Sequence, residues 1–482
     1  MNVREKYIAV IGLEVHAQLL TKTKAYSSDE NIYGAIPNTK TSTISLGHPG
    51  TLPRINKKVI EYAVKLGIAL GSDIRERNEY ARKNYFYADL PKGYQITQDK
   101  TPICNGGSVR IKDADGNYKN IGITRVHMEE DAGKSIHDLD PFNTLIDLNR
   151  AGVPLVEVVS EPDIRSSEEA YQYVNEVRKL VRYLDICDGN MEEGSLRCDA
   201  NISVMLSGAK QFGTKVEVKN MNSSRNIKRA IEFEISRQIA LLEKGELIKH
   251  ETRSYNATNN TTVSMRHKED ANDYRYFPEP DLQPVIVTKE YIKQIKKKLP
   301  PLPNKLFKIF TTEFNLSEYD SNILIDEKEI ALYFKDICMY TKNYKSAANF
   351  VMGSVKSYLN ENAISIIDFP IKPEQLATLI TLIEEDKVSH TVATSKIFPA
   401  MLDSNETAEK LANSNNWIQE SDNDLLIKYI KQAINKYPNK VIDYKGGKKG
   451  LIGLFMGEVM KLSKGKADPK IANQLLKIEL EK

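Results

Sequence analysis

The sequence predicts an α+β protein, with a mainly antiparallel sheet and packed helices first, then a helical domain and a small helical tail. Two kinds of periodicity predict this, because strand-like alternation occurs in the first part of the chain and helical patterns fill the second. A lysine run followed by three prolines at residues 296–305 separates the two parts, as a linker does. We expect domains at residues 1–295, 296–405 and 406–482, the last boundary falling in the Ser-, Asn- and Glu-rich segment 404–424.

Four segments alternate apolar and polar residues as half-buried strands do: residues 10–19, 121–135, 197–204 and 215–220. In the first of them, Leu13 and Val15 face one way while Glu14 and His16 face the other. A single antiparallel sheet, apolar toward helices and charged on its other side, explains all four segments. The residues that we predict to be catalytic on its polar side are Glu14, His16, Glu129, Glu130, Asp199 and Glu217.

The central segment, 121–135, carries three adjacent acids, Glu129, Glu130 and Asp131. Neighbouring carboxylates repel one another and favour exposure unless a cation holds them. One interpretation is a solvated surface turn. The other is a site for a hard cation, because Mg²⁺ binds carboxylate oxygens together with substrate phosphates. The recurrence of polar faces in the other three segments favours phosphate chemistry with a bound metal.

Composition restricts the class of protein. With 482 residues, 41% hydrophobic and 28% charged, the chain is long enough for about three domains of ordinary globular type. A net charge of +3 predicts nothing about partners, so nucleic-acid binding would need a local basic patch. The four cysteines are scattered, and no apolar run is long enough for a signal peptide or membrane span. We therefore expect a cytoplasmic protein that does not associate with membranes.

Three segments have the apolar stripe of a helix packed on a sheet: residues 57–70, 166–184 and 223–244. The second begins with Ser166 as N-cap and has Glu169 three residues later. Residues 154–159 form an apolar strand containing Glu157, which is either a site carboxylate or a hydrogen-bonded acid of the core. Residues 27–53 are rich in Ser, Thr, Asn, Gly and Pro, and loops of this length are usually functional or held by other contacts.

Aromatic and basic residues are mixed in two further segments. In residues 82–98, Tyr85 and other aromatics stand among Arg82, Lys83 and Lys92. Such a mixture can stack on and clamp a nucleotide, although alternating aromatics also occur in ordinary strands. In the second segment, 266–282, Arg275 is either a phosphate or RNA contact or the partner of Asp273 or Asp281 in a buried ion pair.

The C-terminal segment 421–482 is basic, with 13 Lys against 7 Asp and Glu. Glycines among its lysines let the backbone approach phosphate, and the lysines supply positive charge. A lysine-rich solvated face is the alternative. The candidate phosphate-binding residues are Lys448, Lys449, Lys461, Lys464 and Lys466.

Longer motifs surround these residues: IGLEVHAQL (11–19), YFYADLPKGYQITQ (85–98), RVHMEEDAGKS (125–135), LNRAGVPLVEVVSEPD (148–163), EEGSLRCDANIS (192–203), KVEVKNMNS (215–223) and DYRYFPEPDL (273–282). Together they closely resemble the B-subunit family of tRNA-dependent aspartyl/glutamyl amidotransferases. The C-terminal part, from Ala393 through MGEVMKLSKGKADP, is similar to the tRNA-binding tail of that family. The resemblance covers essentially the whole chain.

The resemblance implies a cradle-shaped catalytic domain, a helical domain and a small helical tail. It implies an ATP- and Mg²⁺-dependent ligase that phosphorylates the side-chain carboxylate of mischarged Glu-tRNA(Gln) or Asp-tRNA(Asn). Ammonia then displaces the phosphate, giving Gln-tRNA or Asn-tRNA for translation. The ammonia would come from glutamine through an amidase, the A subunit, and a small C subunit would complete a heterotrimer.

Residue by residue, the resemblance implies that the metal and the activation site lie among Glu14, His16, Glu130 and Glu217, with Asp199 a weaker match. Lys83 and Lys92 match basic positions along the ammonia route. The residues predicted to bind nucleotide or substrate are Lys83, Tyr85, Lys92, Arg150, Lys215, Lys219 and Asn220. The five lysines of the basic tail would contact tRNA.

One departure from the family pattern concerns zinc. Many members carry cysteine pairs in the first long loop, where they form a zinc knuckle. The corresponding loop here, residues 25–53, has Ser27, Ser28, Ser42 and Ser45 and no Cys. We therefore predict that this protein binds no zinc.

Two other functions stay open at this point. A noncatalytic tRNA-binding or assembly subunit would explain the basic tail and the lack of a GxxxxGK[ST] phosphate loop. A stand-alone ATP-dependent ligase would use glutamine without a partner, but no cysteine has an evident glutaminase setting. ATP hydrolysis stimulated by mischarged tRNA separates the catalytic subunit from an adaptor.

Overall fold

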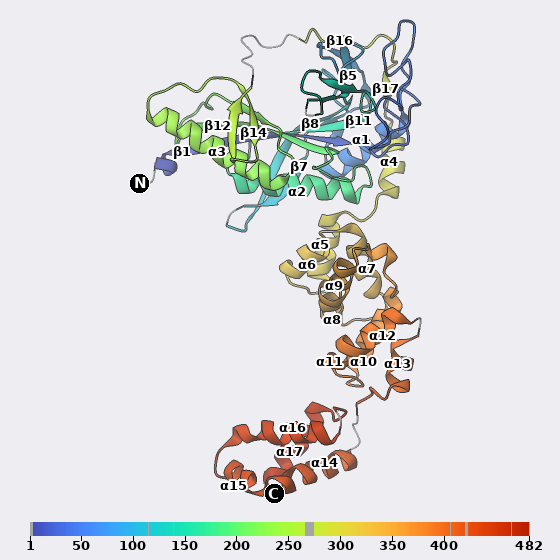
Figure 1. Ribbon diagram of the computed structural model, residues 1–482, viewed down its shortest axis with the longest axis vertical. Helices are drawn as coiled ribbons and strands as arrows, with labels where there is room; N and C mark the ends of the chain where they lie inside the picture. Colours follow the sequence, from blue (N-terminus) through green and yellow to red (C-terminus); the bar gives the residue numbers. More distant parts are fainter. Residues whose placement is uncertain are drawn as a thin grey trace. The chain divides into compact units, whose positions relative to one another are not determined.

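The computed structural model describes residues 3–113, 115–137, 139–265, 274–404, 406–419, 423–463 and 465–481. The chain forms two compact units, Met1–Leu302 and Pro303–Lys482. The first combines a large sheet with helices, and the second is built of helices in its described residues (Figure 1). The predicted α+β class with a helical C-terminal region is therefore confirmed. None of the helices in the described residues is long and apolar enough to span a membrane.

A 10-stranded sheet is the core of the first unit, with the order β15-β14-β13-β12-β1-β11-β8-β6-β2 and with β7 beside β8. Its strands are β1 (Tyr7–Gln18), β2 (Asp73–Ile74), β6 (Cys104–Asn105), β7 (Ser108–Lys112), β8 (Tyr118–Glu130), β11 (Pro154–Ser160), β12 (Leu196–Leu206), β13 (Val216–Lys219), β14 (Thr252–Asn256) and β15 (Thr261–Ser264). The pairs are antiparallel except for β13 with β14, which are parallel.

The four segments predicted as strands are β1, β8, β12 and β13, and all belong to this sheet. The segment 121–135 is not one strand, because β8 ends at Glu130 and the chain turns before β9 (Lys134–Ile136). At this turn the Asp131 amide donates to the Val153 carbonyl at 2.8 Å. Gly133 follows, where a Cβ atom would lie 2.8 Å from the Asp89 carbonyl oxygen, so the turn requires glycine.

Three smaller sheets flank the large one in the first unit. Their strands are β16 (Phe277–Pro278), β4 (Ala81–Asn84) and β5 (Tyr94–Thr97) in the first, β9 with β10 (Leu145–Asp147) in the second, and β17 (Val285–Ile286) with β3 (Arg77–Asn78) in the third. The β4 and β5 strands carry the mixed aromatic and basic segment to the edge of the polar face, where β5 packs beside β8.

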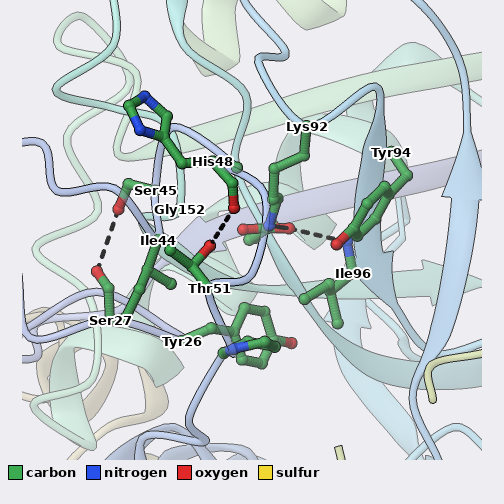
Figure 2. Close-up of a pocket in the computed structure, with 13 residues that line it drawn as sticks. Tyr26, Ser27, Ile44, Ser45, His48, Thr51, Lys92, Tyr94, Ile96 and Gly152 are labelled. Carbon is green, nitrogen blue, oxygen red and sulfur yellow. Dashed lines mark hydrogen bonds and ion pairs between the residues drawn. The ribbon is translucent and has the colours of Figure 1, made fainter. Parts of the chain in front are cut away.

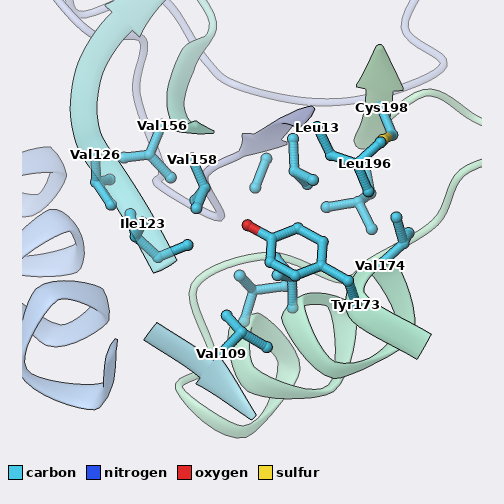
Figure 3. Packing of buried hydrophobic residues seen from close by; sticks show 14 of the residues in the cluster. Leu13, Val109, Ile123, Val126, Val156, Val158, Tyr173, Val174, Leu196 and Cys198 are labelled. Atoms are coloured by element: carbon cyan, nitrogen blue, oxygen red, sulfur yellow. The ribbon is translucent and has the colours of Figure 1, made fainter. Parts of the chain in front are cut away.

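Helices α1 (Lys57–Leu70), α2 (Ser167–Tyr183) and α3 (Ser224–Glu243) pack on the apolar side of the large sheet, as predicted. The predicted cap is confirmed, because the Ser166 hydroxyl accepts a 3.1 Å hydrogen bond from the Glu169 amide. Figure 3 shows Tyr173 of α2 directed at the sheet, beside residues such as Leu13 and Val158. A short helix, α4 (Lys289–Lys298), adds the buried Ile295 to the same core.

The second unit is a series of helices. They are α5 (Pro303–Thr312), α6 (Glu318–Leu324), α7 (Lys328–Ile337), α8 (Tyr344–Phe350), α9 (Lys356–Asn362), α10 (Pro373–Glu384), α11 (His390–Val392), α12 (Phe398–Asp403), α13 (Ala408–Ser414), α14 (Asn423–Lys436), α15 (Pro438–Lys445), α16 (Ile452–Leu462) and α17 (Pro469–Glu481). Two short π-helical turns, Val351–Val355 and Ala393–Ile397, interrupt the series. Helices α14 to α17 share an apolar cluster of their own, which includes Leu426, Phe455 and Leu476.

Candidate functional site

Polar side chains from neighbouring strands meet on one face of the large sheet. His127 of β8 lies opposite Glu157 of β11, and Glu157 lies opposite His16 of β1. His16 in turn lies opposite Arg197 of β12. Residues directly opposite one another in antiparallel strands project to the same face. The strand register therefore brings four residues from distant parts of the sequence into one row.

Two histidines share the carboxylate of Glu157. Its Oε2 atom lies 3.2 Å from His16 Nε2 and 3.2 Å from His127 Nε2. Glu129 completes the group, because its Oε2 atom lies 3.6 Å from His127 Nε2 and accepts a 3.2 Å hydrogen bond from the Thr97 hydroxyl. The exposed fractions of these four side chains lie between 5% and 18%. We call His16, His127, Glu129 and Glu157 the His–Glu cluster.

Burial and charge act in opposite directions in the His–Glu cluster. Burial by itself would lower the pKa of His127, but the carboxylates of Glu157 and Glu129 outweigh it and raise that pKa to about 9. The same balance raises the pKa of His16. Burial would raise the pKa of Glu157, yet the two imidazoles hold it well below its ordinary value. Without a cation the cluster therefore favours protonated imidazoles beside a charged carboxylate, and a bound metal ion would replace the proton on His16.

Three members of the cluster are arranged as metal ligands are. His16, Glu129 and Glu157 each offer one ligand atom, and these atoms lie within 4.8 Å of one another. The Nδ1 atom of His127 is buried and has no hydrogen-bond partner in the described part of the chain. Two carboxylates and one imidazole fit a divalent cation that keeps further positions for water and phosphate, as Mg²⁺ does.

Asp131 lies next to the cluster between two guanidinium groups. Its Oδ2 atom lies 2.7 Å from Arg197 Nη2 and 3.8 Å from Arg150 Nε, and it accepts a 2.7 Å hydrogen bond from the Gln18 amide nitrogen. Burial would raise the pKa of Asp131, but Arg197 and Arg150 outweigh it and lower that pKa. The Arg150 guanidinium also donates to the Ala132 carbonyl at 3.0 Å. Arg150 therefore stabilises the turn after β8 and also neutralises part of the negative charge of Asp131.

The same face continues toward β13 with more acids. Glu14 accepts a 2.9 Å hydrogen bond from Asn201 Nδ2, and Lys219 Nζ lies 2.5 Å from Asp199 Oδ2 and 2.8 Å from Glu217 Oε1. Burial raises the pKa of Glu14, with further contributions from the neighbouring carboxylates. Glu14, Asp199 and Glu217 therefore share a face with His16, as the alternation predicts. Their predicted roles in catalysis and metal binding stay predictions.

Glu130 does not share that face, and the expected grouping of Glu130 with Glu14, His16 and Glu217 is corrected here. Successive residues of a strand point to opposite sides, so Glu130 faces away from Glu129. Its carboxylate is 3% exposed, pairs with the Lys92 ammonium and accepts a 2.9 Å hydrogen bond from the Ile96 amide. Figure 2 shows Lys92 and Ile96 in the small pocket that Glu130 also lines, across from Ser45 and His48 of the long loop after β1.

Lys83 and Tyr85 lie beside the His–Glu cluster. Burial would lower the pKa of the Lys83 ammonium, but the charge of Glu129 outweighs it and raises that pKa. The Tyr85 hydroxyl donates a 3.4 Å hydrogen bond to Gln95 Oε1. Two other predicted binding residues lie at the ends of β13. Lys215 is exposed just before this strand, and Asn220 is exposed just after it and donates to the Ser254 hydroxyl at 2.8 Å.

Four of the five predicted tail lysines lie in the described residues of the second unit. The side chains of Lys448 and Lys449 are 71% and 60% exposed, with Nζ atoms 3.3 Å from Asp443 and 3.6 Å from Glu481. Lys461 is exposed and Lys466 is half-buried, while Lys464 lies outside the described residues. Exposed ion pairs of this kind contribute little to stability, and the binding of phosphate by these lysines stays a prediction.

Sequence reasoning left His127 and Glu157 out of the predicted site. The alternation of 121–135 already puts His127 on the polar side with Glu129. Glu157 stands in an otherwise apolar strand, where a carboxylate needs partners, and it was open whether those lie in a site or in the core. The sequence does not show that β11 pairs with both β1 and β8 in the sheet, which is what brings Glu157 to the two histidines. Asp273, named with Arg275 as an alternative ion pair, lies outside the described residues.

Comparison with known protein families agrees with this layout. Residues 9–293 match the model of the GatB/GatE catalytic domain, and residues 332–480 match that of the GatB domain. The first match covers the sheet, the His–Glu cluster and the pocket of Glu130. The second covers most of the helical unit, including the tail lysines.

Curated relatives match over nearly the full length. A protein of Bdellovibrio bacteriovorus is 50% identical over 98% of this chain and 98% of its own. Relatives from Thermodesulfovibrio yellowstonii and a Synechococcus strain are 47% and 48% identical, each covering at least 98% of both chains. All three are named as the B subunit of an aspartyl/glutamyl-tRNA(Asn/Gln) amidotransferase.

Proposed function

Because this chain belongs to the GatB/GatE family, we propose that it is the B subunit of a tRNA-dependent amidotransferase. Its substrate is the side-chain carboxylate of Glu-tRNA(Gln), Asp-tRNA(Asn) or both, and its product is the corresponding amide. The observation that carries this proposal for the site is the His–Glu cluster on the polar face of the sheet.

The reaction requires activation of a poor electrophile. When bound, ATP would supply the phosphoryl group and Mg²⁺ would neutralise its charge, so that the substrate carboxylate becomes an acyl phosphate with release of ADP and ammonia then displaces phosphate to form the amide. What the protein adds is position and charge, since phosphoryl transfer needs little covalent help. The oxygens of Glu129 and Glu157 and His16 Nε2 would hold the metal ion.

The basic side chains around the cluster would orient the anionic groups. Burial does not neutralise Lys83, because the charge of Glu129 raises its pKa. Burial does not neutralise Lys219 either, because Asp199 and Glu217 raise its pKa. Arg197 stays fixed by Asp131. These cations can face phosphate and carboxylate oxygens without leaving the sheet. The carboxylates of Glu14, Asp199 and Glu217 would neutralise part of the positive charge of these cations and so limit how strongly the site attracts the anionic substrate.

Ammonia for the reaction would come from partners. The relatives are named as one lettered member of an amidotransferase, which supports an enzyme of several different chains. We propose an amidase, the A subunit, and a small C subunit as its other members. Lys92 with Glu130 and Lys83 with Tyr85 are polar groups on opposite sides of β8, and we propose that they border the ammonia route. The exposed tail lysines would hold tRNA through its phosphates.

The decisive experiment replaces the carboxylate shared by both histidines. In the complex with its amidase partner, Glu157→Gln should lower the rate of amide formation on mischarged tRNA by about 100-fold or more, since removal of a single preorganised charged group has that order of effect. Glu61→Gln, on the solvent side of α1, is the matched control and should keep the wild-type rate. Wild-type activity in Glu157→Gln would exclude the cluster as the active site.

ATP hydrolysis in the same samples tests the adaptor alternative. A catalytic subunit hydrolyses ATP faster when mischarged tRNA is present, and Glu157→Gln should lose that stimulation. A tRNA-binding adaptor would show no stimulation in the wild type. Amidation with glutamine by the isolated chain would instead support a stand-alone ligase.

A further inference from the structure

A line of four aromatic rings, exposed at its two ends and half-buried in the middle, borders the His–Glu cluster. Tyr87, Tyr85, Tyr274 and Tyr276 contact one another in that order, with ring centroids 5.9, 6.2 and 5.9 Å apart and interplanar angles of 68°, 72° and 71°. We call these four residues the aromatic rim. Edge-to-face contacts of this kind are a preferred arrangement of aromatic rings, and they hold the four rings in one line.

The aromatic rim is assembled from two distant segments that are firmly joined. The Asn84 amide donates to the Tyr274 carbonyl at 3.0 Å, and Asn84 Nδ2 donates to the carbonyls of Tyr274 and Arg275 at 3.0 and 2.8 Å. Strands β4 and β16 pair next to this junction. Arg275 has a left-handed backbone, with φ of 44°, which residues other than glycine rarely adopt. The fold therefore maintains this arrangement of rings at some conformational cost.

The middle of the rim lies nearest to the cluster, and both of its ends are exposed. At its inner side, Lys83 Nζ lies 4.8 Å from the Tyr274 ring centroid and 5.8 Å from that of Tyr85. The charge of Lys83 interacts with those of Glu129 and Glu157. At the two ends of the rim, Tyr276 is 41% exposed and Tyr87 is 68% exposed. Exposed rings next to charged side chains offer faces on which a planar group can stack.

We propose that the aromatic rim stacks the unpaired bases at the 3′ end of the aminoacyl-tRNA and so directs the attached amino acid to the His–Glu cluster. This inference rests on the proposed function and names the part of the substrate that these residues hold. Rings flanked by lysine and arginine suit single-stranded nucleic acid, because stacking tolerates any base and the cations face the phosphates.

Two features favour the tRNA end over the adenine of ATP or a protein partner. A line of four rings offers stacking surface to more than one base, whereas one adenine needs only one or two rings. The exposed part of the rim is aromatic and flanked by basic groups, whereas the core of a protein interface is depleted in charge.

The test uses the complete amidotransferase complex and the double variant Tyr87→Ala with Tyr276→Ala. The wild type should bind uncharged tRNA about 10-fold more tightly than tRNA lacking its unpaired 3′-terminal nucleotides, given the strength of base stacking. The variant should lose most of that preference. Its KM for mischarged tRNA should rise about 10-fold while kcat changes by less than about twofold, as expected for lost uniform binding.

Two controls accompany the variant. Tyr87→Phe with Tyr276→Phe keeps the rings and should behave as wild type. Phe212→Ala removes a ring that is 58% exposed in the loop between β12 and β13, and should change nothing. If the wild-type complex does not amidate mischarged tRNA, the proposed function fails. If it does but the alanine variant keeps its preference for the intact 3′ end, the rim proposal alone is refuted. A rise in the KM for ATP only, or loss of the amidase partner on purification, would also refute it.

Discussion

At the scale of single residues, Asp29 organises the long loop that follows β1. Its Oδ2 atom accepts hydrogen bonds from the Ser42 amide at 2.9 Å, from the Ser42 hydroxyl at 3.0 Å and from the Ser45 hydroxyl. Ser27 lies 3.1 Å from Ser45 through their hydroxyl oxygens. Burial would raise the pKa of Asp29, but these hydrogen bonds outweigh it and lower that pKa. These hydrogen bonds thus join the part of the loop with Ser27 and Asp29 to the part with Ser42 and Ser45.

Asp29→Ala should loosen this loop. We expect trypsin to cleave after Lys40 about fivefold faster, because hydrogen bonds to a partly exposed carboxylate contribute about 1 kcal/mol. Asp140→Ala removes a similar cap from another loop and should leave that cleavage unchanged. Since the pKa of Asp29 is lowered in the folded protein, its contribution is present at neutral pH and is lost as the pH falls below about 4. Equal cleavage rates in Asp29→Ala and wild type would contradict this role.

Metal analysis of the purified protein tests a related prediction. The loop that in many family members carries zinc-binding cysteines has serines here, and Asp29 accepts hydrogen bonds from two of them. Serine hydroxyls are poor zinc ligands compared with thiolates and imidazoles. We therefore expect no stoichiometric zinc after dialysis against a chelator, with the fold unchanged by circular dichroism. One zinc per chain that resists dialysis would contradict the prediction.

At the scale of elements, helix α2 is held on the large sheet by a buried apolar stripe that contains one unpaired polar group. Ser166 begins the helix, and Tyr173, Val177 and Val181 bury one stripe of it against the strands. The Tyr173 hydroxyl is buried among apolar side chains and has no hydrogen-bond partner in the described ranges (Figure 3). An unpaired buried hydroxyl costs free energy, so this position is not optimal for stability.

Tyr173→Phe should therefore stabilise the protein. Removing the unpaired hydroxyl while keeping the ring should raise the free energy of unfolding by about 1 kcal/mol, measured by denaturant unfolding followed by fluorescence. Tyr171→Phe, on the less buried side of the same helix, should change stability by less than about 0.5 kcal/mol. A loss of stability in Tyr173→Phe would show that the hydroxyl is hydrogen-bonded, for example to a buried water.

At the scale of the whole molecule, the separate apolar cluster of α14 to α17 suggests where the tail begins. Helix α13 packs on α10, and the Gln419 amide donates to the Lys387 carbonyl at 2.7 Å. The tail cluster starts with Leu426. We therefore propose a tail from residue 420 onward rather than from 406, within a three-part division that stays a prediction.

Removal of residues 420–482 should leave the rest of the chain folded and weaken tRNA binding. The slope of log K against log salt concentration should decrease by about 0.9 for each phosphate that the tail contacts. Substitution of Lys448, Lys449, Lys461 and Lys466 by alanine should reproduce most of the loss, measured by fluorescence anisotropy with labelled tRNA. Unchanged tRNA affinity in the truncated protein would contradict a role for the tail.

The sequence by itself determined which residues face which way. Alternation in β1, β8 and β12 separates the apolar side from Glu14, His16 and Glu129, because the side-chain period of a strand is two residues whatever its neighbours are. Local signals also determined helix starts, such as the Ser166 cap, since a cap depends on residues only three positions apart. The fold class and the family resemblance follow from patterns of this local kind.

Only the tertiary structure decided which strands are neighbours and in what register. Glu157 contacts His16 and His127 because β11 lies between β1 and β8 in the sheet. Strands β1 and β11 are more than 100 residues apart in the sequence, so only the folded chain shows that they pair. It also decided that the carboxylate of Glu130 pairs with Lys92, a residue that the alternation of β8 does not identify. Periodicity gives the face of a residue, but its partner across the sheet depends on long-range packing that no local pattern contains.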